Sequence, residues 1–162
     1  MKIINLHTNE EVEAIIEPIQ IQDYKAIKSS KEFEFNWKAY KDKEVYKLRL
    51  EETSAILGLI CIVPYPDKGY QFLHIEAVEV GKPNKGKKKK LDKIAGCLIA
   101  FAGRQSFITG CTGVIMLVAK TEVANLYHSK YGFQFIGSMG TLGERMVSDY
   151  YNTNELIKKY LG

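Results

Sequence analysis

The sequence is poor in the residues that mark secreted, metal-binding or membrane-spanning proteins. It has only three cysteines, Cys61, Cys97 and Cys111, which lie in apolar runs or beside a glycine and never at the spacing of metal ligands. No stretch approaches the ~18 apolar residues of a membrane span, and the first residues lack the apolar core of a signal peptide. We therefore expect a cytoplasmic protein with reduced cysteines, no metal site and no membrane anchor.

The chain also lacks a strong charge of either sign. Its 23 Lys and Arg against 19 Asp and Glu leave a net charge of +4, which is too small an excess to indicate nucleic-acid binding by itself. Apolar residues make up 46% of the chain, as in globular rather than disordered proteins. Because one domain typically takes about 150 residues, we expect a single domain over residues 1–162.

The N-terminal third of the chain gives weak or mixed signals. Residues 1–6 alternate enough to predict a short strand. Thr8 and Glu11 have the spacing of a capping box, and the apolar residues after them favour a helix that ends at Pro18. Residues 19–43 mix aromatic and charged side chains at neither helical nor strand spacing, so we expect an irregular segment with at most a single helical turn.

Beyond residue 45 the pattern becomes regular. Alternation and apolar runs predict an antiparallel meander over 46–50, 55–63 and 71–80. Apolar residues at helical spacing predict a long helix that starts near residue 94, after a lysine-rich loop. The rest of the chain predicts a strand over 114–119 that is parallel to the preceding strand, and a helix over 122–131 that ends at Gly132. Two more strands are expected over 133–136 and 145–147, followed from about residue 152 by a last helix capped by Asn152 or Thr153.

Two segments of the chain resemble a known family. The run KLDKIA (90–95) precedes and opens the long helix, and the run VANLYHSKYGF (123–133) covers the next helix and the start of a strand. They are similar to the patterns Q/R-x-x-G-x-G/A and A-x-x-L-Y-x-x-x-G-F of the GNAT superfamily of acyl-CoA-dependent N-acetyltransferases. In the first pattern, Lys90 stands for Gln or Arg, Ala95 is an allowed last residue, and Lys93 replaces the first glycine. The second pattern is assigned to Leu126, Tyr127, Gly132 and Phe133.

The resemblance implies a mixed α/β fold with a mostly antiparallel central sheet, helices on both faces, and a splay between the fourth and fifth strands. It implies acetyl-CoA as cosubstrate and direct transfer of its acetyl group to a primary amine of a small molecule or a protein. Backbone groups at Val78 and Val80 would bond the pantetheine arm and polarise the thioester carbonyl. The further cofactor-binding residues would be Lys90, Lys93, Ile94, Ala95 and Gly96.

Physical chemistry supports an anion site at the start of the long helix. The first backbone N–H groups of a helix have no partner within it and point along a favourable dipole. Lys85 and the run 87–90 add positive charge within a Debye length of about 8 Å. The alternative is that these lysines form a solvated run without a ligand.

The base that removes the amine proton is expected on the strand over 71–80. A period of two puts His74 and Glu76 on one face of this strand, with Phe72, Val78 and Val80. The resemblance makes Glu76 the first candidate, with His74 as base or substrate contact and Glu79 in reserve. The structural alternative is that Glu76 pairs with an arginine such as Arg49 or Arg145.

The resemblance assigns to Tyr127 the protonation of the leaving thiolate. A phenol with a pKa near 10 is protonated at neutral pH, as a donor must be. The alternative for Tyr127 is core packing, with its hydroxyl bonded to the backbone. Cys97 and Cys111 have no His at motif spacing, so we expect neither to act as a nucleophile.

Two other functions and the acceptor stay open. A non-catalytic acyl-CoA-binding domain of the same fold would accommodate Lys93 in place of glycine. A nucleic-acid-binding module would use the lysine-rich loop with exposed aromatic residues such as Trp37 and Tyr40. An acidic wall for a polyamine or aminoglycoside would use Glu32, Glu34 and Asp42. The chain is expected to be a monomer or a homodimer.

Overall fold

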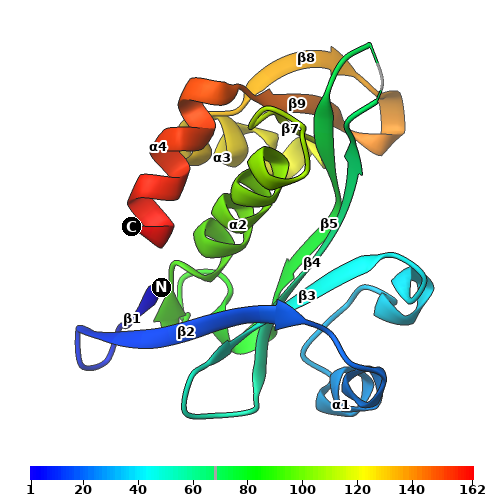
Figure 1. Cartoon of the computed structure of the whole chain (residues 1–162). Coiled ribbons are helices and arrows are strands. Elements are labelled where there is room, and N and C mark those ends of the chain that lie inside the picture. Colours follow the sequence, from blue (N-terminus) through cyan, green and yellow to red (C-terminus); the bar gives the residue numbers. More distant parts are fainter. Residues whose placement is uncertain (68) are drawn as a thin grey trace. The chain divides into compact units, whose positions relative to one another are not determined.

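The computed structural model describes residues 1–67 and 69–162 (Figure 1). Its strands are β1 (Lys2–Asn5), β2 (Glu10–Pro18), β3 (Glu44–Leu50), β4 (Ile56–Tyr65), β5 (Phe72–Val80), β6 (Leu91–Asp92), β7 (Ile115–Ala119), β8 (Gln134–Ser138) and β9 (Glu144–Ser148). Its helices are α1 (Ile21–Ser30), α2 (Ile94–Ile108), α3 (Thr121–Tyr131) and α4 (Tyr150–Leu161), with short 3₁₀ turns η1 (Trp37–Tyr40), η2 (Lys82–Asn84) and η3 (Gly140–Leu142).

The strands of the described residues form one nine-stranded sheet in the order β6-β1-β2-β3-β4-β5-β7-β9-β8. The pair β5 and β7 is parallel, whereas β7 with β9 and β8 with β9 are antiparallel. The expected mixed α/β fold with a mostly antiparallel sheet and flanking helices is thus confirmed. The fourth and fifth strands of the sequence prediction, over 71–80 and 114–119, correspond to β5 and β7.

Internal contacts divide the chain into two compact units. The first comprises Met1–Cys61 and Ala77–Leu98, and the second comprises Ile62–Glu76 and Ile99–Gly162. A single domain over residues 1–162 stays a prediction. None of the helices in residues 1–67 and 69–162 is long and apolar enough to cross a membrane.

The helix predicted before Pro18 is wrong, because this segment is strand β2. The Asn5 side chain accepts from the His7 N–H at 3.0 Å, and Asn9 takes a left-handed φ of 59°. This turn sends the chain back along β1, and β2 then pairs with β1 on one side and β3 on the other. The Thr8 hydroxyl accepts from the Glu10 N–H instead of capping a helix.

Helix α1 lies in the segment that was expected to be irregular. It starts with a reciprocal capping box between Gln20 and Asp23, in which the Asp23 carboxylate accepts from the Gln20 N–H at 2.8 Å. Ile27 is its one buried residue among those described. Since the helix buries so little, its sequence shows no apolar periodicity, and the local caps define it instead.

The segment after α1 is fixed by a buried carboxylate on β5. Glu79 is only 4% exposed and accepts from the backbone N–H groups of Glu34 and Phe35, at 2.6 and 3.2 Å, and from the Trp37 indole N–H at 2.8 Å. Trp37 packs in a core cluster with Ile27. Three N–H donors offset the cost of burying this charge.

We expect Glu79→Gln to destabilise the protein by about 2–4 kcal/mol, because the new amide N–H₂ would face donors instead of accepting from them. The measurement is urea unfolding. Glu34→Gln is the matched control, since this side chain is exposed, and it should change the free energy of unfolding by less than about 0.5 kcal/mol. Equal stabilities of the two variants would contradict the anchoring role of Glu79.

Within the second unit, α4 packs closely against α2. A Cβ atom on Gly103 would lie 2.5 Å from Thr153 Cγ2, so this helix crossing needs glycine. Helix α4 begins after Asp149, whose carboxylate accepts from the Asn152 N–H, and not at the expected Asn152 or Thr153. Thr153 is instead buried and hydrogen-bonds the Ser148 hydroxyl.

Candidate functional site

The turn before α2 is held from two sides. Strand β6 pairs with β1 through Ile4 with Asp92 and Asn5 with Leu91. The Asn84 side chain accepts from the Leu91 N–H at 2.9 Å. The path into α2 is therefore set by contacts outside the helix.

Lys93, which stands where the pattern has glycine, has a backbone conformation that favours glycine. Its φ is 77°, in the left-handed region, and its N–H donates to the Asp92 carboxylate at 2.8 Å. A residue with a Cβ in this conformation costs about 1–2 kcal/mol. The turn at this position therefore holds a lysine in a left-handed conformation that glycine would adopt without strain.

The first three residues of α2 are the cofactor candidates Ile94, Ala95 and Gly96. The Cys97 N–H donates to the Lys93 carbonyl at 3.0 Å and opens the helical ladder. The N–H groups of the three residues before it therefore have no acceptor within the helix, which is the arrangement that binds anions.

Lysines surround this helix start. Lys90 is exposed, and its backbone N–H and C=O are taken by Pro83 and Leu6. Lys89 is engaged, because its Nζ donates to the Asp92 carboxylate at 2.7 Å. Val78 and Val80 occupy half-buried positions of β5 that alternate with buried ones, as the period of two predicts.

The strain at Lys93 can be measured. We expect Lys93→Gly to be more stable than Lys93→Ala by about 1 kcal/mol, since only glycine relieves the positive φ, while part of that gain is lost to unfolded-chain entropy. Both variants remove the same charge, so urea unfolding of the pair isolates the backbone effect. Equal stabilities would show that the left-handed turn is not present in solution.

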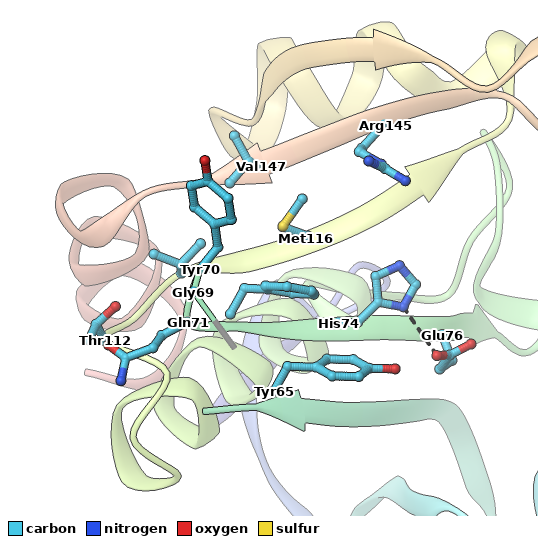
Figure 2. Close-up of a pocket in the computed structure, with 12 residues that line it drawn as sticks. Tyr65, Gly69, Tyr70, Gln71, His74, Glu76, Thr112, Met116, Arg145 and Val147 are labelled. Carbon is cyan, nitrogen blue, oxygen red and sulfur yellow. Dashed lines mark hydrogen bonds and ion pairs between the residues drawn. The ribbon is translucent and has the colours of Figure 1, made fainter. Parts of the chain in front are cut away.

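The second unit contains a pocket of about 670 Å³. Figure 2 shows its lining on β5, β7 and β9, with the pair His74 and Glu76 at one side. The described lining residues are Tyr65, Gly69, Tyr70, Gln71, Phe72, His74, Glu76, Thr112, Val114, Met116, Arg145 and Val147. A pocket of this size suits a small ligand.

His74 and Glu76 lie together, as their spacing predicted. The His74 Nδ1 is 3.3 Å from a Glu76 carboxylate oxygen, and both side chains are about one-quarter exposed. Glu76 therefore combines a neighbouring imidazole with access to the pocket. Glu79 does not share this position, because its carboxylate is buried and bonded to three N–H donors.

Neither arginine considered as a partner of Glu76 forms that ion pair. Arg49 pairs with Glu17, with Nε 2.6 Å from the carboxylate. Arg145 lines the same pocket as Glu76, but no residue within 1–67 and 69–162 forms an ion pair with it. The sequence suggested Arg145 only as a partner of Glu76 and not as a pocket residue. The alternation of the strand over 145–147 is the signal that could have placed Arg145 on the same face as Val147, which also lines the pocket.

Tyr127 packs among aromatic rings on α3. Its ring centroid is 5.9 Å from that of Tyr131 and 5.7 Å from that of Phe133. Burial raises the pKa of the phenol to about 12, so it keeps its proton at neutral pH. Tyr127 is not among the described residues that line the pocket.

The spacing on α3 needs a correction. The assigned pattern has three residues between Tyr and Gly, but four separate Tyr127 from Gly132, so the residue at the pattern's tyrosine position is His128. The His128 Nδ1 is 2.7 Å from the Phe133 carbonyl oxygen, which can only accept, so Nδ1 carries the hydrogen of this bond. The second ring nitrogen, Nε2, is not used in this bond. The catalytic role of Tyr127 stays a prediction.

The cysteines and the exposed aromatics of the alternative functions have structural explanations. Burial raises the pKa of the Cys97 thiol to about 11, which disfavours the thiolate that a nucleophile needs. Trp37 is only 2% exposed, so the expectation that it is an exposed platform for bases is wrong. Tyr40 is half-buried against the same core cluster.

Comparisons with solved structures identify the fold. The chain is similar to a GNAT-family acetyltransferase from Listeria monocytogenes 4b F2365, with a TM-score of 0.60 and 16% identity over 83% of this chain and 94% of that one. It is also similar to the Bacillus subtilis N-acetyltransferase YlbP in complex with coenzyme A, with a TM-score of 0.56 and 14% identity over 84% of this chain and 96% of that one. A mutant of the toxin AtaT bound to the C-terminus of the antitoxin AtaR and acetyl-CoA has a TM-score of 0.56 and 11% identity, over 90% of this chain and 98% of that one.

No protein-family model and no curated protein matches the sequence. The structural similarity nevertheless covers most of this chain and nearly all of each of those proteins. The chain therefore has the GNAT-superfamily fold.

Proposed function

We propose that the protein is an acetyl-CoA-dependent N-acetyltransferase that transfers the acetyl group directly to a primary amine. The observation that carries the proposal is the turn at Lys93, where a lysine adopts a glycine-type conformation directly before a helix whose first amides have no acceptor within the helix. Backbone strain of this kind persists where the surrounding structure and function require it. The fold shared with acetyltransferases supports the same reading.

In this proposal the cofactor is held mainly by the backbone. The N–H groups of Ile94, Ala95 and Gly96 bind the diphosphate, and Lys90 adds charge beside them. Val78 and Val80 offer backbone groups to the pantetheine arm. The glycine at 96 and the alanine at 95 keep side chains out of the way of the phosphates.

The chemistry begins with removal of a proton from the acceptor ammonium. Glu76 takes this proton directly or through a water, with His74 beside it at 3.3 Å. The free amine nitrogen then forms a bond to the thioester carbonyl carbon, the C–S bond breaks, and the sulfur leaves as a thiolate. The nitrogen loses its second proton to solvent, the thiolate takes up a proton, and the products are an amide and a free thiol.

The donor for the departing sulfur is proposed to lie on α3, where Tyr127 and His128 are the two candidates. A phenol with a pKa of about 12 holds its proton against an ordinary thiolate near ~8.5, so Tyr127 would act by a hydrogen bond rather than by complete transfer. His128 would transfer a proton only from its charged form.

Binding of the cofactor is tested by calorimetry with acetyl-CoA. We expect a Kd of about 100 μM or tighter, and weakening by about two- to fivefold in Lys90→Ala because one charge beside the diphosphate is lost. Lys25→Ala, an exposed lysine on α1, is the matched control and should bind like the unchanged protein. No binding at several hundred micromolar would defeat the proposed function.

The roles in catalysis are tested by thiol release from acetyl-CoA. Glu76→Gln should lower kcat/KM by about 10²–10⁴ at neutral pH, and the loss should shrink as rising pH deprotonates the acceptor without a base. Glu122→Gln, exposed at the start of α3, should leave the rate unchanged. A loss that does not change with pH would contradict the base role.

Tyr127→Phe and His128→Gln are compared in the same assay, and the variant that lowers kcat by about 10–10³ identifies the donor. Acetyl-CoA affinity should be unaffected in both, because neither residue is proposed to bind the cofactor. If neither variant lowers kcat, the donor does not lie on α3. Binding without thiol release for any amine would instead favour the non-catalytic alternative.

A further inference from the structure

The pocket around Glu76 contains an arginine that the proposed reaction does not use. Arg145 on β9 is exposed, and no described residue forms an ion pair with it. Figure 2 shows its side chain on the pocket side of β9, in the same view as His74 and Glu76. A guanidinium is a fixed positive charge whose planar fork matches carboxylate and phosphate oxygens.

Glu76 and Arg145 both lie beyond the last pair of the parallel ladder between β5 and β7. That ladder ends where His74 pairs with Met116. Glu76 follows two residues later on β5, and Arg145 pairs with Val118, two residues later on β7. Both side chains line the same pocket.

The pocket offers separate partners for a cation and an anion. The Glu76 carboxylate and the Arg145 guanidinium both line it. A ligand that fills the pocket can therefore place an ammonium group at Glu76 and an anionic group at Arg145.

The rest of the pocket is largely apolar and aromatic. Tyr65 and Phe72 stack with ring centroids 5.0 Å apart, and Met116 and Val147 pair with one another on the adjacent strands. Phe72 lies four residues from Glu76 along β5, about 13 Å at the rise of a strand. An apolar or aromatic body can therefore extend along β5 away from the amine.

We infer that the acceptor is an amine that also carries an anionic group, a carboxylate or a phosphate, and an apolar or aromatic side chain. The inference rests on the proposed function and specifies its substrate class. It disfavours a polyamine or aminoglycoside, because Glu76 is the one carboxylate among the described lining residues and Arg145 repels further ammonium groups.

The experiment measures thiol release from acetyl-CoA with three acceptors that differ in one group. These are 2-phenylethylamine, phenylalanine, which adds a carboxylate, and the corresponding aminophosphonate, which adds a phosphonate. We expect kcat/KM to be about 10- to 100-fold higher with an anionic group, as for a charge-assisted hydrogen bond. The stronger of the two anionic acceptors identifies which oxyanion the site prefers.

Arg145→Gln should abolish this preference by lowering kcat/KM for the two anionic acceptors to the level of 2-phenylethylamine, and Arg145→Lys should restore part of it. Arg104→Gln, an exposed arginine on α2 that is not among the lining residues, is the matched control and should retain the preference. Equal rates for all three acceptors, or a preference that survives Arg145→Gln, would overturn the inference.

A binding measurement separates this inference from the proposed function. Calorimetry with N-acetylphenylalanine and N-acetyl-2-phenylethylamine needs no turnover, and we expect the first to bind about tenfold more tightly unless Arg145 is replaced. If acetyl-CoA binds but neither the anionic amines nor this acetylated acid is selected, the substrate class is wrong and the acetyltransferase proposal stands. If acetyl-CoA does not bind, the proposed function fails, whatever the pocket selects.

Discussion

The parallel ladder between β5 and β7 ends after the pairs Leu73–Ile115 and His74–Met116, and the candidate acceptor pocket depends on this register. With His74 opposite Met116, the half-buried positions of both strands share the face on which the pocket lies. Because strand side chains alternate, a slip of one residue would turn Glu76 away from the pocket and bring Ala77 in its place. A second, antiparallel ladder pairs β7 with β9 and sets the position of Arg145 through its pair with Val118.

Alternation also gives the two carboxylates of β5 opposite environments. Glu76 occupies a half-exposed position beside His74, where a carboxylate can exchange protons with a ligand. Glu79, three residues on, falls at a buried position and is satisfied by N–H groups of the segment after α1. One strand thus provides the proposed base and a residue that fixes a loop. The two differ because one lies at an even and the other at an odd position of the strand, which face opposite sides.

The cofactor end of the proposed site depends on the backbone more than on side chains. Lys93 shows this, since the turn keeps its positive φ without the glycine that would adopt it at no cost. The surrounding bonds from Asn84 and the pairing of β6 with β1 supply the constraint.

The sequence alone determined the elements whose signals are local and strong. Apolar runs predicted β4, β7 and α2, and glycine predicted the end of α3, because burial and positive φ leave direct marks on residue choice. Only the tertiary structure decided that residues 10–18 form a strand. The local capping-box spacing favours a helix, but hydrogen bonding to β1 on one side and β3 on the other stabilises the strand. The same holds for the site. The period of two put His74 beside Glu76, but the presence of Arg145 in the same pocket depends on the long-range pairing of β5, β7 and β9, which no local pattern encodes.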